Sequence, residues 1–404
     1  MNFKLTVIIL VVIIGVYQTV LNVVRQRSAN NPTPDNLSDV YDAETYSRWK
    51  MYSAEYSKLS ILSGLVSCII PILLLVTNAY SLFASIFPGG AFMQLFAVIL
   101  LEVVVSTVVS SVFSYISTMK IEEKYGFNRS TKKTFIFDKI REFIVEMVIS
   151  LGLSTLLWLL YTALGDWLVL LFAVAVFIIV LAITFLYPLL SRIGNTFTPL
   201  ADGDLKDSLM ELLTKHGYKV KAIEVMDASR RTTKLNAYFT GFGKMKTIVL
   251  YDNLVNTMTT DEICAVFAHE LGHGLHRDVI KSQLLNFGNL LIMSLIVWVT
   301  VKVPQLHTAF GFEGVNFGFA YVLLSVGLGV VQPFTSLVIN ARSRCAEYRA
   351  DKQSVEEGYK EPMVTALKKL ARENFAHLSP SRINVLLEYS HPPLAERISA
   401  IEKN

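Results

Sequence analysis

Long apolar runs alternate with charged, polar segments along this chain of 404 residues. About 20 helical residues rising ~1.5 Å each are needed to cross ~30 Å of hydrocarbon. Seven runs meet that length, so the pattern predicts seven membrane-spanning helices joined by polar segments. The runs occupy residues 5–24, 60–80, 92–117, 142–164, 167–190, 283–303 and 318–339.

The first apolar run has the position of a signal peptide. It is about twice as long as a typical signal-peptide core, and no small-x-small cleavage site precedes Arg25. We therefore interpret it as a retained membrane anchor.

Lysine and arginine are concentrated in alternate polar segments, namely 25–59, 118–141, 191–282 and 340–404. Basic residues near spanning helices favour the cytoplasmic side. The pattern predicts that the N-terminus is external and that the long polar segments and the C-terminus are cytoplasmic. Termini on opposite sides of the membrane require an odd number of spans, and seven is odd.

The polar segment 193–281 has its own secondary-structure pattern. Residues 204–216 have an amphipathic helical pattern, and 220–226 alternate as a strand. Residues 236–240 and 247–251 flank Gly241-Phe242-Gly243-Lys244, which predicts a hairpin. One strand of the hairpin can bind an extended peptide by main-chain hydrogen bonds. The alternative, which is compatible with this one, is that the hairpin only packs the sheet.

The pentad His269-Glu270-Leu271-Gly272-His273 lies on a predicted helix in this segment. Thr259 and Glu262 have the spacing of a capping box, which predicts the start of that helix. Histidines four residues apart share a helix face and can bind one zinc ion, while Glu270 lies where it can deprotonate a water. The pentad therefore predicts a zinc hydrolase.

A third protein ligand is needed for a catalytic zinc site. Asn340, Arg344, Glu347 and Asp351 recur on one face of a predicted helix after the last span. The two intervening spans form a hairpin that returns this helix to the side of His273. Glu347 is the candidate ligand, and the alternative is a solvated charged face.

Other candidate residues carry weaker signals. His391 lies between Ser390 and two prolines, where it could stabilise an oxyanion or be an ordinary loop histidine. His276 lies two turns beyond His269, and we expect it at the surface or behind the ligands. Glu102 and Glu146 lie within spans, where they could line a water-filled cavity or bond a neighbouring helix. We assign no role to His216, His307 or His377.

Several motifs in a fixed order resemble the membrane-embedded CAAX prenyl protease 1 family, the type that converts the yeast a-factor precursor, and we expect a bacterial member. The resemblance covers most of the chain. Its motifs are Tyr125-Gly126-Phe127-Asn128 with Thr131, Asn236-Ala237-Tyr238-Phe239, Gly241-Phe242-Gly243-Lys244, the pentad at 269–273, Glu347-Tyr348-Arg349-Ala350-Asp351, and His391-Pro392-Pro393 with Glu396-Arg397.

The resemblance implies an α-helical integral membrane protein whose spans form a chamber, with an α+β gluzincin-like zinc protease domain on the cytosolic side. It implies one zinc ion per chain, held by His269, His273 and Glu347. Glu270 would be the general base, Asp351 a second acid or an orienter of a ligand histidine, and His391 an oxyanion donor. Asn236, Ala237, Tyr238 and Phe239 would bind substrate, with Asn340, Arg344 and Arg397 in support. Arg277-Asp278 departs from the Asn-His pair common in the family, so it stays open whether Asp278 orients a ligand.

We expect four regions: spans 1–5 with their loops in 1–192, the zinc domain in 193–281, spans 6 and 7 in 282–340, and the third ligand and C-terminal catalytic segment in 341–404. A hydrophobic content of 52% and a charged content of 17% exclude an ordinary soluble globule. The net charge of +4 is not pooled in an aromatic-interleaved patch, so no nucleic-acid partner is expected. Cys68, Cys264 and Cys345 have no metal-site spacing and do not predict a disulfide framework.

We therefore predict a zinc endopeptidase whose substrate is a peptide or protein, prenylated or not, at a lipid membrane. One alternative is a quality-control metalloprotease with unprenylated substrates. A seven-span transporter or receptor and an inactive scaffold are more distant alternatives.

Overall fold

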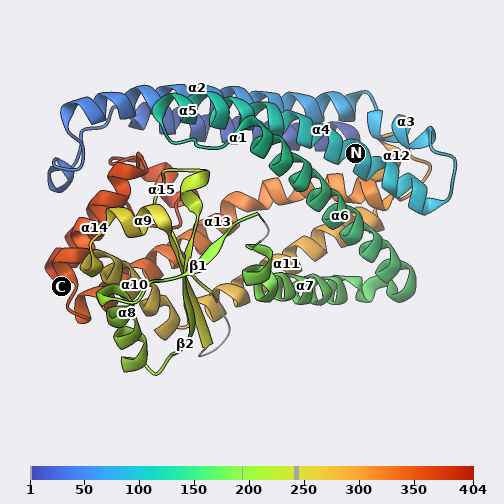
Figure 1. Ribbon diagram of the computed structural model, residues 1–404. Coiled ribbons are helices and arrows are strands. Elements are labelled where there is room, and N and C mark those ends of the chain that lie inside the picture. Colours follow the sequence, from blue (N-terminus) through green and yellow to red (C-terminus); the bar gives the residue numbers. More distant parts are fainter. Residues whose placement is uncertain (1, 193, 241–244) are drawn as a thin grey trace.

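Long helices and a small mixed α/β part make up the protein (Figure 1). This computed structural model describes residues 2–192, 194–240 and 245–404. Its α-helices are α1 (Phe3–Ser28), α2 (Ala43–Val76), α3 (Ala79–Ser85), α4 (Ala91–Ile116), α5 (Glu123–Tyr125), α6 (Lys132–Leu164), α7 (Leu168–Leu190), α8 (Asp204–Lys215), α9 (Asp252–Thr257), α10 (Thr260–Leu275), α11 (Asp278–Lys302), α12 (Gln305–Thr308), α13 (Phe317–Glu356), α14 (Lys360–Glu373), α15 (Arg382–Glu388) and α16 (Leu394–Lys403). Its strands are β1 (Phe197–Pro199), β2 (Lys219–Met226), β3 (Ala237–Thr240) and β4 (Met245–Tyr251).

Six helical segments of the described chain are long and apolar enough to cross a membrane. They overlap six of the predicted spans, and they are Phe3–Ser28, Ala43–Val76, Ala91–Tyr125, Lys132–Trp167, Asp278–Lys302 and Phe317–Glu356. The predicted span at 167–190 falls on α7, in which Leu170–Thr184 is a shorter apolar helix. A seventh crossing stays a prediction.

The second span differs from its predicted limits. Helix α2 begins at Ala43, where the Asp42 carboxylate accepts the Thr45 backbone N–H and caps the helix. It ends at Val76, and Asn78 adopts a left-handed conformation with φ of 57° before α3 begins. A residue in this conformation cannot continue a right-handed helix, so the apolar run at 60–80 is divided.

The sheet lies in the polar segment between α7 and α10, with strand order β1-β2-β4-β3. Strand β2 is parallel to β4, while β1 and β3 are antiparallel to their neighbours. The predicted helix at 204–216, strand at 220–226 and paired hairpin strands are therefore confirmed. The predicted turn Gly241-Phe242-Gly243-Lys244 lies outside the described residues. Strand β3 is at the edge of the sheet, where a further strand could pair with it.

Helix α10 is packed between the sheet and the C-terminal helices. Leu271 and Cys264 of α10 belong to the same buried cluster as Ile248 of β4 and Leu213 of α8. On another side, Ala265 joins a cluster with the C-terminal helices. This burial fixes the helix that carries the histidine pentad.

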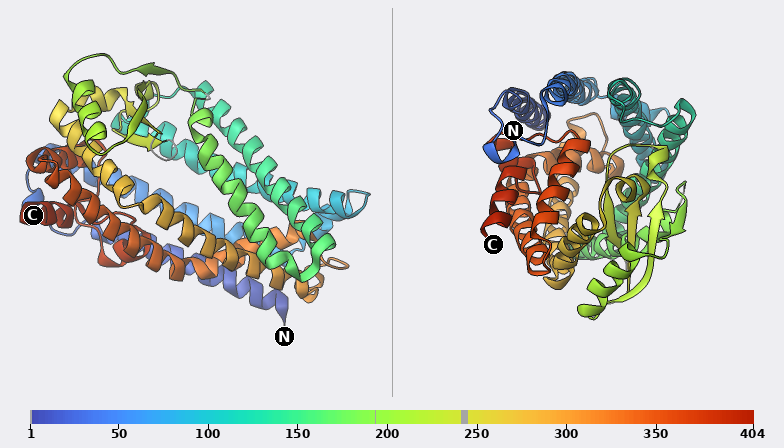
Figure 2. Two further views of the ribbon diagram at one scale, coloured as in Figure 1. Left: turned by 90° about the horizontal axis from the view of Figure 1, so that it is seen from below. Right: turned by 60° about the vertical axis from the view of Figure 1, so that its left-hand side comes forward.

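Helix α13 joins the two parts of the molecule as one continuous rod. It runs without a break from the apolar bundle past the region boundary expected at 340, and it packs against α10 (Figures 1 and 2). The last predicted span and the predicted ligand helix are thus a single 40-residue helix.

Candidate active site

Helix α10 starts at the predicted capping box. The Thr259 hydroxyl accepts the Glu262 backbone N–H at 3.3 Å, and the Glu262 carboxylate accepts the Thr259 N–H at 2.9 Å. The Lys369 ammonium of α14 donates to the same carboxylate at 2.7 Å. The cap satisfies backbone donors at the start of the helix and ties it to α14.

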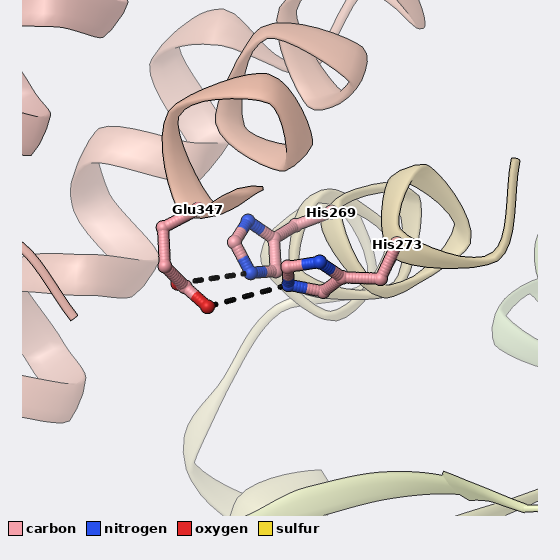
Figure 3. Close-up of side chains that lie close together, drawn as sticks. All are labelled: His269, His273 and Glu347. Carbon is pink, nitrogen blue, oxygen red and sulfur yellow. Dashed lines mark ion pairs between the residues drawn. The ribbon is translucent and has the colours of Figure 1, made fainter. Parts of the chain in front are cut away.

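His269 and His273 of α10 face Glu347 of α13 (Figure 3). His269 Nε2 lies 3.5 Å from Glu347 Oε2, and His273 Nε2 lies 3.3 Å from Glu347 Oε1. Ligand atoms about 2.1 Å from a tetrahedral ion are separated by ~3.4 Å, so these spacings suit one zinc ion. Glu347 Oε2 is buried without a hydrogen-bond partner, as expected for an oxygen that binds a cation. The donor set and this oxygen therefore fit zinc.

Gly272 lets the two helices approach closely enough to form this group. A Cβ atom built at Gly272 would lie 2.9 Å from the Ala350 Cα and 3.0 Å from the Gln353 Cβ. Ala350 is one turn along α13 from Glu347. The absence of a side chain at Gly272 thus sets the distance between the histidines and the glutamate.

Asp351 is buried behind His269 rather than open to a substrate. Its Oδ1 lies 2.8 Å from His269 Nδ1, and its side chain is 2% exposed. Arg397 donates to both Asp351 oxygens, at 2.6 and 2.9 Å. Burial disfavours the charged imidazole, but hydrogen bonds with Asp351 and Glu347 outweigh it and raise the pKa of His269 to about 9. Of the two roles expected for Asp351, this geometry favours orienting His269.

His273 has a corresponding partner that the sequence left in doubt. Its Nδ1 lies 3.2 Å from Asp278 Oδ2, and Arg349 of α13 donates to Asp278 Oδ1 at 2.7 Å. Arg277 has a φ of 55°, and this left-handed residue makes the turn that brings the first residue of α11 back to His273. The departure from the family motif thus places a carboxylate behind the second histidine.

The C-terminal segment brings a third imidazole to the group. His391 Nε2 lies 3.4 Å from Glu347 Oε1, and the side chain is 64% exposed. The Ser390 hydroxyl lies 2.9 Å from His391 Nδ1. Asn340 and Arg344 do not join the His-His-Glu group. They donate instead to backbone carbonyls of the segment before His391, at Val385, Leu387 and Tyr389. These hydrogen bonds hold the segment that carries His391 against α13.

Glu270 follows His269 on α10 and lies beside the edge strand. It lines a small, mainly apolar cavity together with Ala237 and Tyr238 of β3, and Val266 and Phe267 of α10. Asn236 precedes the strand, its side-chain oxygen accepting the Ala237 N–H at 2.9 Å. Phe239 pairs with Ile248 in the backbone ladder. The expected general base, Glu270, and the expected peptide-binding strand are therefore neighbours.

The remaining histidines lie elsewhere. His276 is the C-terminal cap residue of α10 and is partly exposed. His216 bonds Glu357 at 2.8 Å, His307 bonds the Thr300 carbonyl at 3.0 Å, and His377 bonds Ser28 at 2.9 Å. These contacts join the end of α8 to the end of α13, α12 to α11, and the segment between α14 and α15 to α1.

The two carboxylates within spans bond neighbouring helices. Glu102 accepts the Tyr80 hydroxyl, and Glu146 accepts the Ser106 hydroxyl at 3.2 Å. Of the two roles expected for them, these contacts correspond to bonding a neighbouring helix.

Comparison with known families assigns both parts of the chain. Residues 199–404 match peptidase family M48, and residues 22–192 match the N-terminal region of CAAX prenyl proteases, described as five membrane helices.

Two curated relatives cover nearly the whole chain. A CAAX prenyl protease 1 homolog of Oryza sativa subsp. japonica is 27% identical over 98% of this chain and 96% of its own length. The CAAX prenyl protease 1 of Saccharomyces cerevisiae is 30% identical over 93% of this chain and 90% of its own. Among solved structures, that of S. mikatae Ste24p is similar with a TM-score of 0.92, 26% identity and 99% coverage of both chains.

Proposed function

We propose that this chain removes the C-terminal tripeptide from prenylated CAAX peptides. It belongs to peptidase family M48, and it is a multi-pass membrane metalloendopeptidase that resembles the CAAX prenyl proteases. The observation that carries the proposal is the position of Glu270. It lies next to the ligand group on α10 and lines one cavity with Ala237 and Tyr238 of the edge strand.

His269, His273 and Glu347 would hold one zinc ion, supported by the fit of their spacing and by the buried Glu347 oxygen. Zinc in this set supplies Lewis acidity, which makes a water more acidic and polarises a carbonyl. The carboxylates behind the ring nitrogens of the two histidines would fix the rings so that Nε2 faces the ion.

The chain's own residues would carry the proton transfers. Glu270 would take a proton from the attacking water and deliver it to the leaving amine when the peptide C–N bond breaks. His391, 64% exposed beside Glu347, would donate to the oxygen of the tetrahedral intermediate. Asp351, buried between His269 and Arg397, would orient rather than transfer a proton to substrate.

An extended substrate would pair with β3 through main-chain hydrogen bonds. The edge position of β3 and the shared cavity with Glu270 support this arrangement. In this proposal the chain has four regions, with boundaries at residues 192, 281 and 340. Its seven spans form a chamber, and a gluzincin-like zinc domain lies beside them.

The basic segments support a cytosolic zinc domain and C-terminus. The membrane would be a bacterial inner membrane, or the endoplasmic reticulum if the chain is eukaryotic. Membrane lipid and a peptide or protein are the expected partners, and nucleic acid is not.

The test pairs metal content with cleavage in the purified, detergent-solubilised protein. Wild type and Glu270→Gln are each given a farnesylated CAAX peptide and its unprenylated twin. We expect about one zinc per chain in both proteins and cleavage by wild type alone, because glutamine keeps the fold but cannot accept a proton. Absence of zinc from the wild type would contradict the site assignment.

The twin peptides decide the substrate class. Cleavage of the farnesylated peptide alone supports the CAAX proposal. Equal cleavage of both supports the second candidate, a quality-control metalloprotease, which uses the same chemistry on unprenylated chains.

A further inference from the structure

The segment 231–235 leads directly into the edge strand β3, and groups outside its own sheet hold it. The Asn253 amide donates to the carbonyls of Thr232 and Lys234, at 3.2 and 2.8 Å. Asn374, at the end of α14, accepts the Leu235 N–H at 3.0 Å and donates to the Leu235 carbonyl at 3.3 Å. The start of the strand is therefore fixed by its neighbours as well as by the ladder with β4.

A loop of the membrane bundle contacts segment 231–235 from the other side. Residues 126–130 follow the third span, and Asn128 bridges Thr232 in antiparallel fashion. The Arg129 N–H donates to the Arg231 carbonyl at 3.0 Å, and the Thr233 N–H donates to the Phe127 carbonyl at 3.3 Å. The loop thus adds a short pairing to the chain just before β3.

The loop itself is anchored to a π-helical turn, Ser117–Glu122, that continues α4. The Glu122 carbonyl accepts the N–H groups of Phe127 and Asn128, at 2.8 and 3.3 Å. The Glu122 carboxylate accepts the Lys234 ammonium at 2.8 Å, with side chains 20% and 34% exposed. Lys234 also lies over the Phe127 ring, 5.4 Å from its centroid. One residue of the span therefore holds both the loop and the segment before the strand.

We propose that Glu122 and Lys234 are positioning residues for substrate binding, because their ion pair couples the end of the third span to edge strand β3. This inference rests on the proposed function, in which β3 binds the peptide. A peptide that pairs with β3 gains hydrogen bonds only if the strand stays extended at a fixed distance from Glu270. The pair would fix that distance from the membrane side, while the zinc ligands on α10 and α13 remain independent of it.

The coupling is tested with Glu122→Gln, Lys234→Gln and Lys234→Arg in the full-length protein. The matched control is Lys124→Gln, which breaks the neighbouring Lys124–Glu55 pair between α5 and α2 without touching segment 231–235. The measurements are amide hydrogen exchange of residues 235–240, zinc content, and separate KM and kcat values for an internally quenched peptide.

We expect both glutamine variants to raise the exchange rate of 235–240 and to raise KM about threefold, the scale of a partly exposed ion pair. Zinc content and kcat should stay near wild type. Lys234→Arg keeps the charge and the contact with the Phe127 ring, and it should restore both readouts. Lys124→Gln should change neither.

Unchanged exchange in 235–240 for both glutamine variants would overturn the coupling, whatever the enzyme cleaves. If the glutamine variants exchange faster in 235–240 but keep the wild-type KM, the pair does not position the strand for substrate binding. If the wild type cleaves no peptide, the proposed function fails, and the exchange data still decide whether the pair holds the strand.

Discussion

Replacing Gly272 with alanine should impair zinc binding more than it impairs folding. The added Cβ would lie 2.9 Å from the Ala350 Cα, which is backbone of α13 and cannot rotate away. Carbon atoms that are not bonded prefer separations of about 3.5–4.0 Å. The two helices must therefore separate locally by ~0.6–1.1 Å, and Glu347 lies one turn from the contact.

The size of this shift sets the expected effect. Overpacking of this kind costs about 1–3 kcal/mol, while the helical preference of alanine over glycine returns about 1 kcal/mol. Unfolding stability should thus fall by roughly 0–2 kcal/mol. Metal distances tolerate only about 0.2 Å, so we expect zinc affinity to fall about 10- to 100-fold, as when a partner that orients a ligand is lost.

The assay is competitive zinc binding against a chromophoric chelator, with thermal unfolding of the same samples. Gly274→Ala is the matched control on the same helix. Among the described residues its Cβ would meet the end of the flexible Tyr218 side chain, with the hydroxyl oxygen at 3.0 Å and Cζ at 3.7 Å. Wild-type zinc affinity in Gly272→Ala would refute the argument that this glycine sets the distance between the helices. Equal losses in both variants would refute it as well.

Three further outcomes are expected. Asp278→Ala should weaken zinc binding about 10-fold, because it leaves His273 Nδ1 and Arg349 without their shared partner. Asp278→Asn should weaken zinc binding less. Zinc titration of both variants measures the difference. Removing zinc with a chelator should abolish cleavage, and adding zinc back should restore it, whereas failure of zinc to restore activity would argue for another ion. Burial favours the neutral form of Glu357, but hydrogen bonds from Lys215 and His216 outweigh it and hold its pKa below the ordinary 4.5. The ionised Glu357 therefore stabilises the fold above about pH 4.5, and this stabilisation is lost as the pH falls through the lower pKa of the folded state. The difference in unfolding free energy between wild type and Glu357→Gln should shrink as the pH is lowered.

The sequence predicted the elements whose signal is local. The Thr259–Glu262 capping box and the alternating strand at 220–226 are short-range patterns, and the structure confirms both. Helical periodicity likewise placed Glu347 and Asp351 on one face. The sequence left two roles open for Asp351, and only its distance of 2.8 Å from His269 Nδ1 favours the orienting role over the acid role.

The features that the sequence missed depend on contacts between distant segments. Asp278 was in doubt because nothing local shows that the left-handed Arg277 turns it back towards His273. The end of the second span was misplaced because an apolar run continues through the break at Asn78. The Glu122–Lys234 pair joins residues 112 positions apart, and no periodic pattern indicates such a contact.

The unbroken course of α13 also limits how a lipid-anchored substrate can reach the site. Glu347 lies seven residues beyond Asn340, where the apolar stretch ends, and thus about 10 Å further along the rod at ~1.5 Å per residue. A peptide anchored at the hydrocarbon edge needs about three extended residues to cover that height. In a CAAX peptide the bond to be cut adjoins the lipidated cysteine, so no such tether exists. For the proposed prenylated substrate, the isoprenoid itself would have to cover that height, and the protein would have to shelter from water the part that leaves the bilayer.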